Sequence, residues 1–293
     1  MNINQLTQQI RYLDINTNRL VNEVFAGNYK SSFKGQGLEI KNLRKYEPGD
    51  DIKHIDWITS SKEGELFIKE YQETRERTTI LVIDTSASMN FTSTGTTKKQ
   101  VTIETAAILL FSALKTNDKF GLILFNNQTQ LYLPPQKGKV HLLRILREIV
   151  IAFENNHRTT TDQNHSLSFF NQIVKKHSIC FLISDDIDTS QQQNLKIINQ
   201  KHDFVVIQII DPFEQQITAQ SAISLLDYET NQPLTIDLNN QTVINNYNLL
   251  RHQKYLNQQQ VLKKHAIDHV IISTPDNIYK QLLIFFKKRQ LLF

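Results

Sequence analysis

Hydroxyl and carboxylate side chains follow an apolar run in the segment TTILVIDTSASMNFTST, residues 78–94. Asp84, Ser86 and Ser88 stand at alternate positions directly after ILVID. One carboxylate with two neutral hydroxyls supplies hard oxygen ligands, which suit Mg²⁺ with its ligands at about 2.1 Å, whereas zinc prefers His and Cys. The same residue types are also common in turns and at helix N-caps. A metal site therefore needs further oxygen ligands from elsewhere in the chain.

Two later segments offer such ligands. The loop HRTTTDQNHSL runs into a helical pattern and carries Thr159, Thr160 and Thr161. Asp185 directly follows the apolar run SICFLIS, as Asp84 follows ILVID. Because the carboxyl ends of parallel strands meet at one edge of a sheet, and ligands bind there, we expect the two carboxylates to converge.

Short apolar runs alternate with amphipathic helical stretches from residue 78 onward. We expect strands at 79–84, 120–126, 178–184 and 204–210, and helices at about 98–115, 139–154, 164–176 and 190–200. The strands are apolar on both faces, which predicts a mostly parallel sheet flanked by helices in a doubly wound α/β domain. Beyond it the pattern predicts a polar hairpin at 219–238, a long helix at about 241–265, a strand at 269–273 and a closing helix at 277–289.

The first 77 residues have a different character. Mixed spacings of three and four predict a helix over residues 3–25 that ends near Gly27. Residues 33–75 contain short alternating segments around a Pro48-Gly49 turn, which predicts a small β-rich subdomain. We therefore divide the chain into residues 1–77, a central domain of 78–215 and a C-terminal extension of 216–293 that packs on the same core.

The composition limits the classes of protein that remain. A chain of 293 residues that is 40% hydrophobic can bury one large core. No apolar run reaches the roughly 18 residues of a membrane span, and the polar N-terminus is not expected to act as a secretory signal or an anchor. The single cysteine, Cys180, lies in an apolar strand and is expected to be a core residue of a reduced, cytoplasmic protein. The net charge of +4 is spread along the chain and does not indicate nucleic-acid binding.

The motifs DTSAS, TTTD and LISD resemble, in order and spacing, the metal-ion-dependent adhesion site of von Willebrand factor A domains. The resemblance implies a Rossmann-like fold and a bound Mg²⁺, with Mn²⁺ or Ca²⁺ as alternatives. It further implies that Ser86 and Ser88 bind the ion directly, that Thr161 binds directly or through water, and that Asp84 and Asp185 act largely through water or as hydrogen-bond acceptors. An acidic side chain of a partner would fill the open coordination position.

Two of these assignments leave alternatives. Domains of this kind usually have a Thr-Asp pair, which selects Thr161 over Thr159 and Thr160. Asp186 is the alternative to Asp185, since both follow the same strand.

Segments on both sides of these motifs indicate a more specific family. YEPGDDIKHIDW, LFIKEYQETRE, IIDPFEQQI and LLDYETNQPLTID look like the bacterial proteins of domain-of-unknown-function family 58, over about residues 25–240. Such proteins are typically encoded beside AAA+ ATPases of the MoxR type. The resemblance implies a non-enzymatic, chaperone-like module that acts with such an ATPase on a protein client. Many relatives carry membrane segments, which this chain lacks, so any contact with a membrane would be peripheral and through partners.

Two other functions remain as alternatives. One is a scaffold whose metal site is unused and whose binding lies in the N-terminal subdomain. The other is an aspartyl phosphotransferase that uses Asp84 as its nucleophile. Phosphatases of the haloacid type need a second acid two residues later, where this chain has Ser86, and this disfavours the enzyme.

The segment GLEIKNLRKYEPGDDIKHIDWITSSK, residues 37–62, gathers polar and aromatic side chains around its Pro-Gly turn. The candidates are Arg44, Tyr46, Asp50, Asp51, Asp56 and Trp57. They would form either a buried ion-pair lattice that docks the small subdomain onto the central domain, or a partner-binding face, since Trp, Tyr and Arg dominate interfaces. We favour the structural role, because buried acids need fixed basic partners.

His265 and His269 are four residues apart, as in helical zinc sites. The helix is expected to end before His269, which places the two on different elements and argues against zinc.

Overall fold

The computed structural model describes residues 17, 21, 23–31, 33, 39–72, 77–155, 161–190, 192–217, 223–226, 233–236 and 240–291. The chain divides into two compact units: residues 34–77 form one, and residues 1–33 together with 78–293 form the other.

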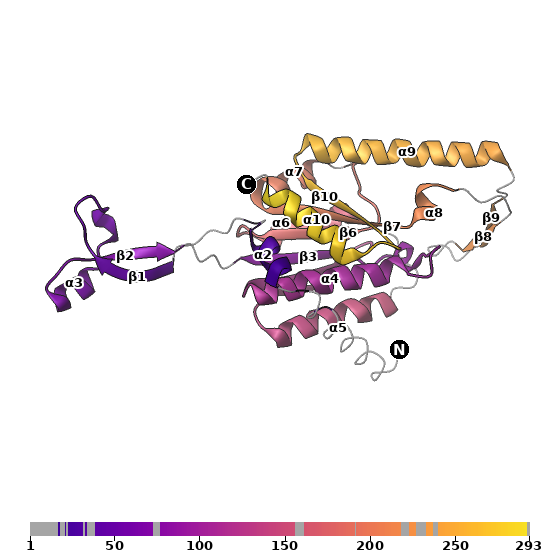
Figure 1. Ribbon diagram of the computed structural model, residues 1–293. Coiled ribbons are helices and arrows are strands. Elements are labelled where there is room, and N and C mark those ends of the chain that lie inside the picture. The colour runs from indigo at the N-terminus through magenta and orange to yellow at the C-terminus, as the bar shows by residue number, and fades with distance from the viewer. Residues whose placement is uncertain are drawn as a thin grey trace. The chain divides into compact units, whose positions relative to one another are not determined.

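A six-stranded sheet forms the centre of the larger unit (Figure 1). Its strands are β3 (Thr78–Asp84), β4 (Lys119–Phe125), β5 (Thr129–Gln136), β6 (Ile179–Ser184), β7 (Asp203–Ile210) and β10 (Asp268–Ser273). The order across the sheet is β10-β7-β6-β3-β4-β5, and all neighbours are parallel except β4 and β5. Counted within this sheet, it is the Rossmann-like order 3-2-1-4-5-6. The predicted fold class is confirmed.

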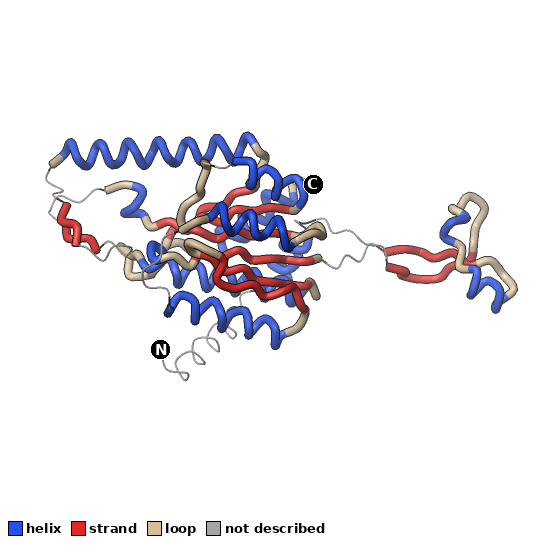
Figure 2. The backbone as a smooth tube through the Cα atoms, turned by 180° about the vertical axis from the view of Figure 1, so that it is seen from behind, coloured by secondary structure: helices blue, strands red, loops and turns tan. Residues whose placement is uncertain are grey.

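Helices cover both faces of the sheet because its strands are apolar on both sides (Figure 2). Leu81 and Ile83 of β3 face one core, shared with α2 (Glu23–Ser31), α4 (Lys98–Lys115), α5 (Lys139–Asn155) and α10 (Ile278–Gln290). Ile80 and Val82 face the other core, shared with α6 (Gln163–Ile173), α7 (Gln192–Lys201) and the last turns of α9 (Gln241–Lys264). This alternation along β3 is the two-residue period of a strand.

Two features differ from the prediction. The antiparallel strand β5 is not among the expected strands, and its Pro134 and Pro135 are unusual in a strand interior. The structure places it at the sheet edge, where proline is tolerated. The N-terminal helix was expected to end near Gly27, but α2 continues through Gly27 to Ser31, so this boundary is wrong. Most of the helix expected at 3–25 lies outside the described residues.

The C-terminal elements belong to the same core. β10 pairs with β7 as the edge strand opposite β5, and α10 buries Leu282 and Phe286 against the first core. A short helix, α8 (Pro212–Gln215), follows β7, and β8 (Ile223–Leu226) pairs antiparallel with β9 (Pro233–Ile236) within the stretch expected to form a hairpin.

The smaller unit is a two-stranded antiparallel sheet with two short helices. β1 (Glu39–Lys45) pairs with β2 (Phe67–Gln72), and between them lie a 3₁₀ helix, η1 (Ile52–His54), and an α-helix, α3 (Trp57–Glu63). Gly64 ends α3 in the left-handed conformation, at φ 71°. Among its described residues, Ile55 and Ile68 are the buried hydrophobic side chains.

Candidate metal centre

The sheet order creates a crevice at the carboxyl ends of β3 and β6. The chain continues from β3 to β4 and β5 on one side, then from β6 to β7 and β10 on the other. β3 and β6 are parallel neighbours in register, with Ile83 beside Ile183. Asp84 and Asp185 therefore emerge side by side at the point where the strand order reverses, which is where such sheets bind ligands.

Asp84 is fully buried, and both of its oxygens accept hydrogen bonds. Oδ1 accepts from the Ser86 backbone N–H at 2.8 Å, and Oδ2 accepts from the Ser184 hydroxyl at 2.8 Å. Burial, together with the nearby charge of Asp185, raises the pKa of Asp84 above its ordinary value, although the bonds from Ser86 and Ser184 oppose the rise. Asp84 thus orients the loop after β3, and its ionised form has little compensating positive charge among the described residues.

The serine hydroxyls lie together beyond Asp84. Ser86 Oγ and Ser88 Oγ are 3.0 Å apart, at the start of the 3₁₀ turn η2 (Ala87–Asn90). Ser86 is buried, whereas Ser88 reaches the cleft described below. Ser88 is already inside this turn, and the contact between the two hydroxyls places Ser86 and Ser88 on the same side of it.

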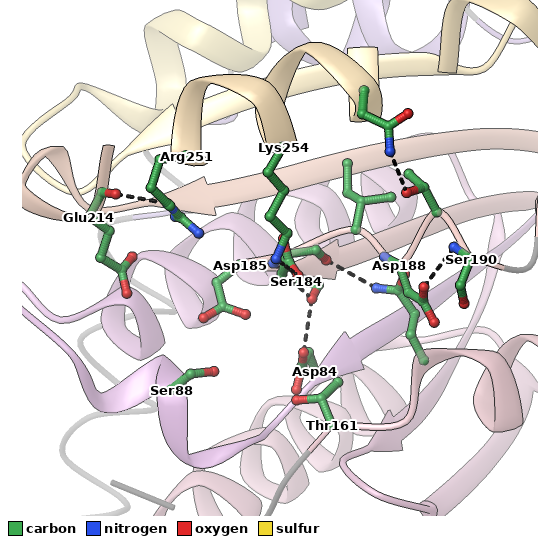
Figure 3. Close-up of a pocket in the computed structure, with 15 residues that line it drawn as sticks. Asp84, Ser88, Thr161, Ser184, Asp185, Asp188, Ser190, Glu214, Arg251 and Lys254 are labelled. Carbon is green, nitrogen blue, oxygen red and sulfur yellow. Dashed lines mark hydrogen bonds and ion pairs between the residues drawn. The ribbon is translucent and has the colours of Figure 1, made fainter. Parts of the chain in front are cut away.

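Thr161 lies on the same cleft as Asp84, Ser88 and Asp185 (Figure 3). The next residue, Asp162, caps α6 by accepting from the His165 N–H at 3.0 Å. The other threonines considered, Thr159 and Thr160, lie outside the described residues.

Asp185 and Asp186 point to different partners. Asp185 Oδ2 accepts from Lys98 Nζ at 2.7 Å. Asp186 turns to α9, where its two oxygens accept from Lys254 Nζ at 2.6 Å and Gln258 Nε2 at 2.8 Å. This geometry favours Asp185 over Asp186 as the second acid of the site.

These side chains line a cleft of about 730 Å³. Its floor carries Asp84, Ser88 and Asp185, and Arg251 and Lys254 reach toward them from α9 (Figure 3). Arg251 Nε donates to the backbone oxygen of Glu214 at 2.9 Å. The cleft therefore has an acidic, hydroxyl-rich floor and a basic wall.

Sequence reasoning missed the residues that surround the five candidates. They are Lys98, Ser184, Glu214, Arg251 and Lys254. Lys98 carried one signal: a lysine at the first position of a helix stands where the helix dipole disfavours a cation.

The donor set fits a hard divalent cation. Two carboxylates and three hydroxyls come from the ends of two neighbouring strands and one loop, and Mg²⁺ favours such oxygen ligands. Among the residues that the structure describes, no group of three or more His, Cys, Asp or Glu side chains could hold a metal. Any metal at this edge would therefore depend on the serine and threonine hydroxyls.

The polar segment of the smaller unit serves mainly turns and caps. Arg44 and Asp50 form a two-pronged ion pair at 2.7 Å, with 42% and 19% of their side chains exposed. Asp51 accepts from the Lys53 N–H, and Asp56 caps α3. Within this unit these charges lie at the surface, so the unit by itself contains no buried lattice among its described residues.

The aromatic candidates of this segment differ in exposure. Tyr46 is half-buried and its N–H bonds the Leu66 carbonyl, at 2.9 Å. Trp57 is 62% exposed, next to the exposed Ile58. This apolar surface is available for a partner.

The histidines and the cysteine are structural. His265 caps the end of α9, whereas His269 lies in β10 and contacts Gln259 through Nδ1 at 3.0 Å. Cys180 is buried, and burial raises the pKa of its thiol well above the ordinary value. The separation of the two histidines agrees with the argument against zinc.

No helix in the described part of the chain combines the length and apolarity that a membrane crossing requires.

Comparisons with known proteins place the chain in a family. The uncharacterized protein Rv1480 of Mycobacterium tuberculosis H37Rv is 22% identical over 227 residues, which cover 77% of this chain and 72% of that protein. The crystal structure of the conserved hypothetical protein BatB from Bacteroides thetaiotaomicron is 15% identical, with a TM-score of 0.49 over 73% of this chain and 98% of that one. The von Willebrand A domain of SpRpn10 is 10% identical, with a TM-score of 0.40 over 71% and 93% of the two chains. The model of the family described as protein of unknown function DUF58 matches residues 42–255, and the chain belongs to this family, as its motifs predicted.

Proposed function

We propose that this chain is a protein-interaction module that binds an acidic side chain of a partner through Mg²⁺. The observation that carries the proposal is the convergence of Asp84, Ser88, Thr161 and Asp185 on one cleft, with Ser86 bonded to Ser88. Mn²⁺ or Ca²⁺ would substitute for Mg²⁺, because all three take oxygen ligands.

Some residues of the candidate metal centre would bind the ion, and others would hold these ligands in position. Ser86, Ser88 and Thr161 would hold the ion, Thr161 either directly or through water. Asp84 already accepts from Ser86 and Ser184, so it would orient the loop and act on the ion largely through water. When bound, Mg²⁺ supplies a positive centre with an open position for a carboxylate.

The wall of the cleft supports an anionic ligand. Arg251 and Lys254 face the acidic floor from α9 (Figure 3). A partner carboxylate that enters between floor and wall would meet the ion on one side and cations on the other. We therefore expect the partner to present an acidic segment rather than an apolar one.

The burial of Asp84 supports binding rather than catalysis. Both Asp84 oxygens accept hydrogen bonds, which lowers their nucleophilicity, and the side chain is fully buried, which restricts the approach of a substrate. Ser86 occupies the position where a haloacid-type phosphatase has its second acid. We expect no turnover of phosphate esters.

Calorimetric titration with Mg²⁺ and Mn²⁺ tests the metal site. The unaltered protein should bind one ion, and Asp84→Asn should abolish binding while circular dichroism shows a folded domain. Asp186→Asn is the matched control, since this acid lies on the same cleft but bonds to α9. Unchanged binding by Asp84→Asn, or loss of binding in the control, would refute the assignment.

The family resemblance supports a partnership with a MoxR-type AAA+ ATPase in the cytoplasm, in assembly or maturation of a protein client. Crosslinked pull-down from the native organism should recover the ATPase while nucleotide is present, and Asp84→Asn should lose the client. Failure to recover any ATPase would favour the scaffold function.

The exposed Trp57 and Ile58 support the scaffold as a second candidate function. A scaffold that binds through residues 34–77 would lose its partner in Trp57→Ala and keep it in Asp84→Asn. The same pull-down with both variants separates the two functions.

A further inference from the structure

Lys98 is an enclosed cation at the first residue of α4. Its side chain is 1% exposed, and its ammonium donates to Asp185 Oδ2 at 2.7 Å and to the two oxygens of Glu214 at 2.8 and 2.9 Å. These contacts with two carboxylates hold Lys98 as an ammonium cation.

A lysine at this position does not stabilise the helix. A cation at a helix N-terminus opposes the helix dipole, and a buried ion pair is often no better for stability than an apolar side chain. The N-terminus of α4 is already capped by Thr97 and Gln100 in a reciprocal capping box. The role of Lys98 must therefore be sought in its two carboxylate partners.

Both partners lie on the cleft of the candidate metal centre (Figure 3). Lys98 takes one oxygen of Asp185 and both oxygens of Glu214. If these oxygens were free, a divalent ion in the cleft would have one more carboxylate, Glu214, and a second oxygen of Asp185 within the same lining. An ion held by several protein carboxylates has little positive charge left for a partner.

Glu214 is held in place independently of Lys98. Its backbone oxygen accepts from Arg251 Nε at 2.9 Å and from the Tyr247 hydroxyl at 3.0 Å. Asp211 caps α8 through the Phe213 N–H at 3.0 Å. Removal of Lys98 would thus leave the Glu214 carboxylate beside the cleft rather than release the helix that carries it.

We infer that Lys98 is a positioning residue that keeps Glu214 and one oxygen of Asp185 away from the metal, so that the ion is weakly held and open to a partner's carboxylate. The inference rests on the proposed metal-dependent function. Replacement of a residue at a metal site ordinarily weakens metal binding, whereas Lys98 is expected to have the opposite effect. Replacement of Lys98 should strengthen metal binding and weaken partner binding.

The test is calorimetric titration with MnCl₂ of four full-length proteins: unaltered, Lys98→Met, Glu214→Gln and Lys98→Met/Glu214→Gln. We expect both proteins that lack Lys98 to bind Mn²⁺ roughly tenfold tighter or more, since a cation has been removed and carboxylate oxygens released. Glu214→Gln keeps Lys98 on Asp185 and should bind no tighter than the unaltered protein. The double variant has the same net charge as the unaltered protein, so tighter binding there reports the released Asp185 oxygen.

Circular dichroism establishes which variants are folded. Folded Lys98→Met or folded double variant that binds Mn²⁺ no tighter than the unaltered protein would overturn the inference, as would tighter binding by Glu214→Gln alone. If Lys98→Met does not fold, the double variant, in which one acid is neutralised, decides. Binding by the variants without binding by the unaltered protein would support the role of Lys98 and refute the proposed function, whereas no binding by any protein would refute both.

Discussion

At the scale of single residues, Asp84 carries a conflict between stability and function. It forms no ion pair with any described residue, and burial beside Asp185 raises its pKa, so the ionised form destabilises the metal-free fold. Asp84→Asn should therefore increase the free energy of unfolding in EDTA by about 1–2 kcal/mol at pH 8. The gain should shrink toward pH 5. A carboxyl whose pKa is raised in the folded state destabilises the protein as the pH rises and the carboxyl ionises, so Asp84 costs less stability at pH 5 than at pH 8. Urea titrations at both pH values measure it, and a less stable variant would contradict the argument.

His202 is a second buried residue with a pH effect, of the opposite sign. Its ring lies 5.0 Å from that of Phe170, and neither ring nitrogen has a hydrogen-bond partner among the described residues. Burial, with smaller effects of His177 and Lys201, lowers the pKa of His202 to about 4. Between the unfolded value near 6.5 and about 4, the unfolded chain binds more protons, so stability falls as the pH falls.

Between pH 7 and pH 4.5 the unaltered protein should lose about 1–3 kcal/mol of unfolding free energy through His202, and His202→Leu should not lose this contribution. The comparison is the difference in unfolding free energy between the two proteins at each pH. His269, whose pKa burial also lowers to about 4, remains in both proteins and cancels. A constant difference across the range would contradict the prediction.

At the scale of elements, the edge strand β5 depends on a glycine in its neighbour. A Cβ at Gly121 of β4 would lie 2.9 Å from the Leu133 carbonyl oxygen and 3.1 Å from Pro135, where the pairing of β4 and β5 is irregular. Gly121→Ala should therefore destabilise the protein by about 1–3 kcal/mol, because β5 must move away. Urea unfolding measures the change.

Gly27 provides the control for that prediction. It lies inside α2, and a Cβ there would meet nothing within 4 Å. Gly27→Ala should stabilise the protein by about 0.5–1 kcal/mol, since alanine is the better helix former. Equal effects of the two substitutions would show that backbone entropy, and not the approach of β5, governs both sites.

At the scale of the whole molecule, the two units differ greatly in size, and the single tryptophan reports on one of them. Trp57 lies in the unit of residues 34–77, whose described hydrophobic core consists of Ile55 and Ile68. A unit this small is marginally stable. Tryptophan fluorescence should therefore change at lower urea concentration than far-UV circular dichroism, to which the larger helical unit contributes most. Coincident transitions would show one cooperative unit.

The cleft is also a property of the whole larger unit. Its lining comes from the ends of β3 and β6, the start of α6, the short helix α8 and the middle of α9. These segments lie as far apart in sequence as Asp84 and Asn257. No single motif contains the site.

Local patterns in the sequence predicted most of the fold and the core of the candidate site. Apolar runs and amphipathic periods located every strand of the parallel sheet, because each such strand is buried on both faces. DTSAS, TTTD and LISD located side chains that line one cleft, because chain order places these motifs at strand and helix ends. Family motifs predicted the membership that residues 42–255 show.

Tertiary structure decided the features that depend on distant neighbours. Pro134 and Pro135 form a strand only because β5 lies at an edge, and α2 passes Gly27 because the buried Phe25 and Tyr29 pack on α10 and the sheet. The ion pairs of Lys98 join residues 87 and 116 positions apart. Spacing along a chain reports the period of an element, whereas the partner of a buried charge is set by which elements meet.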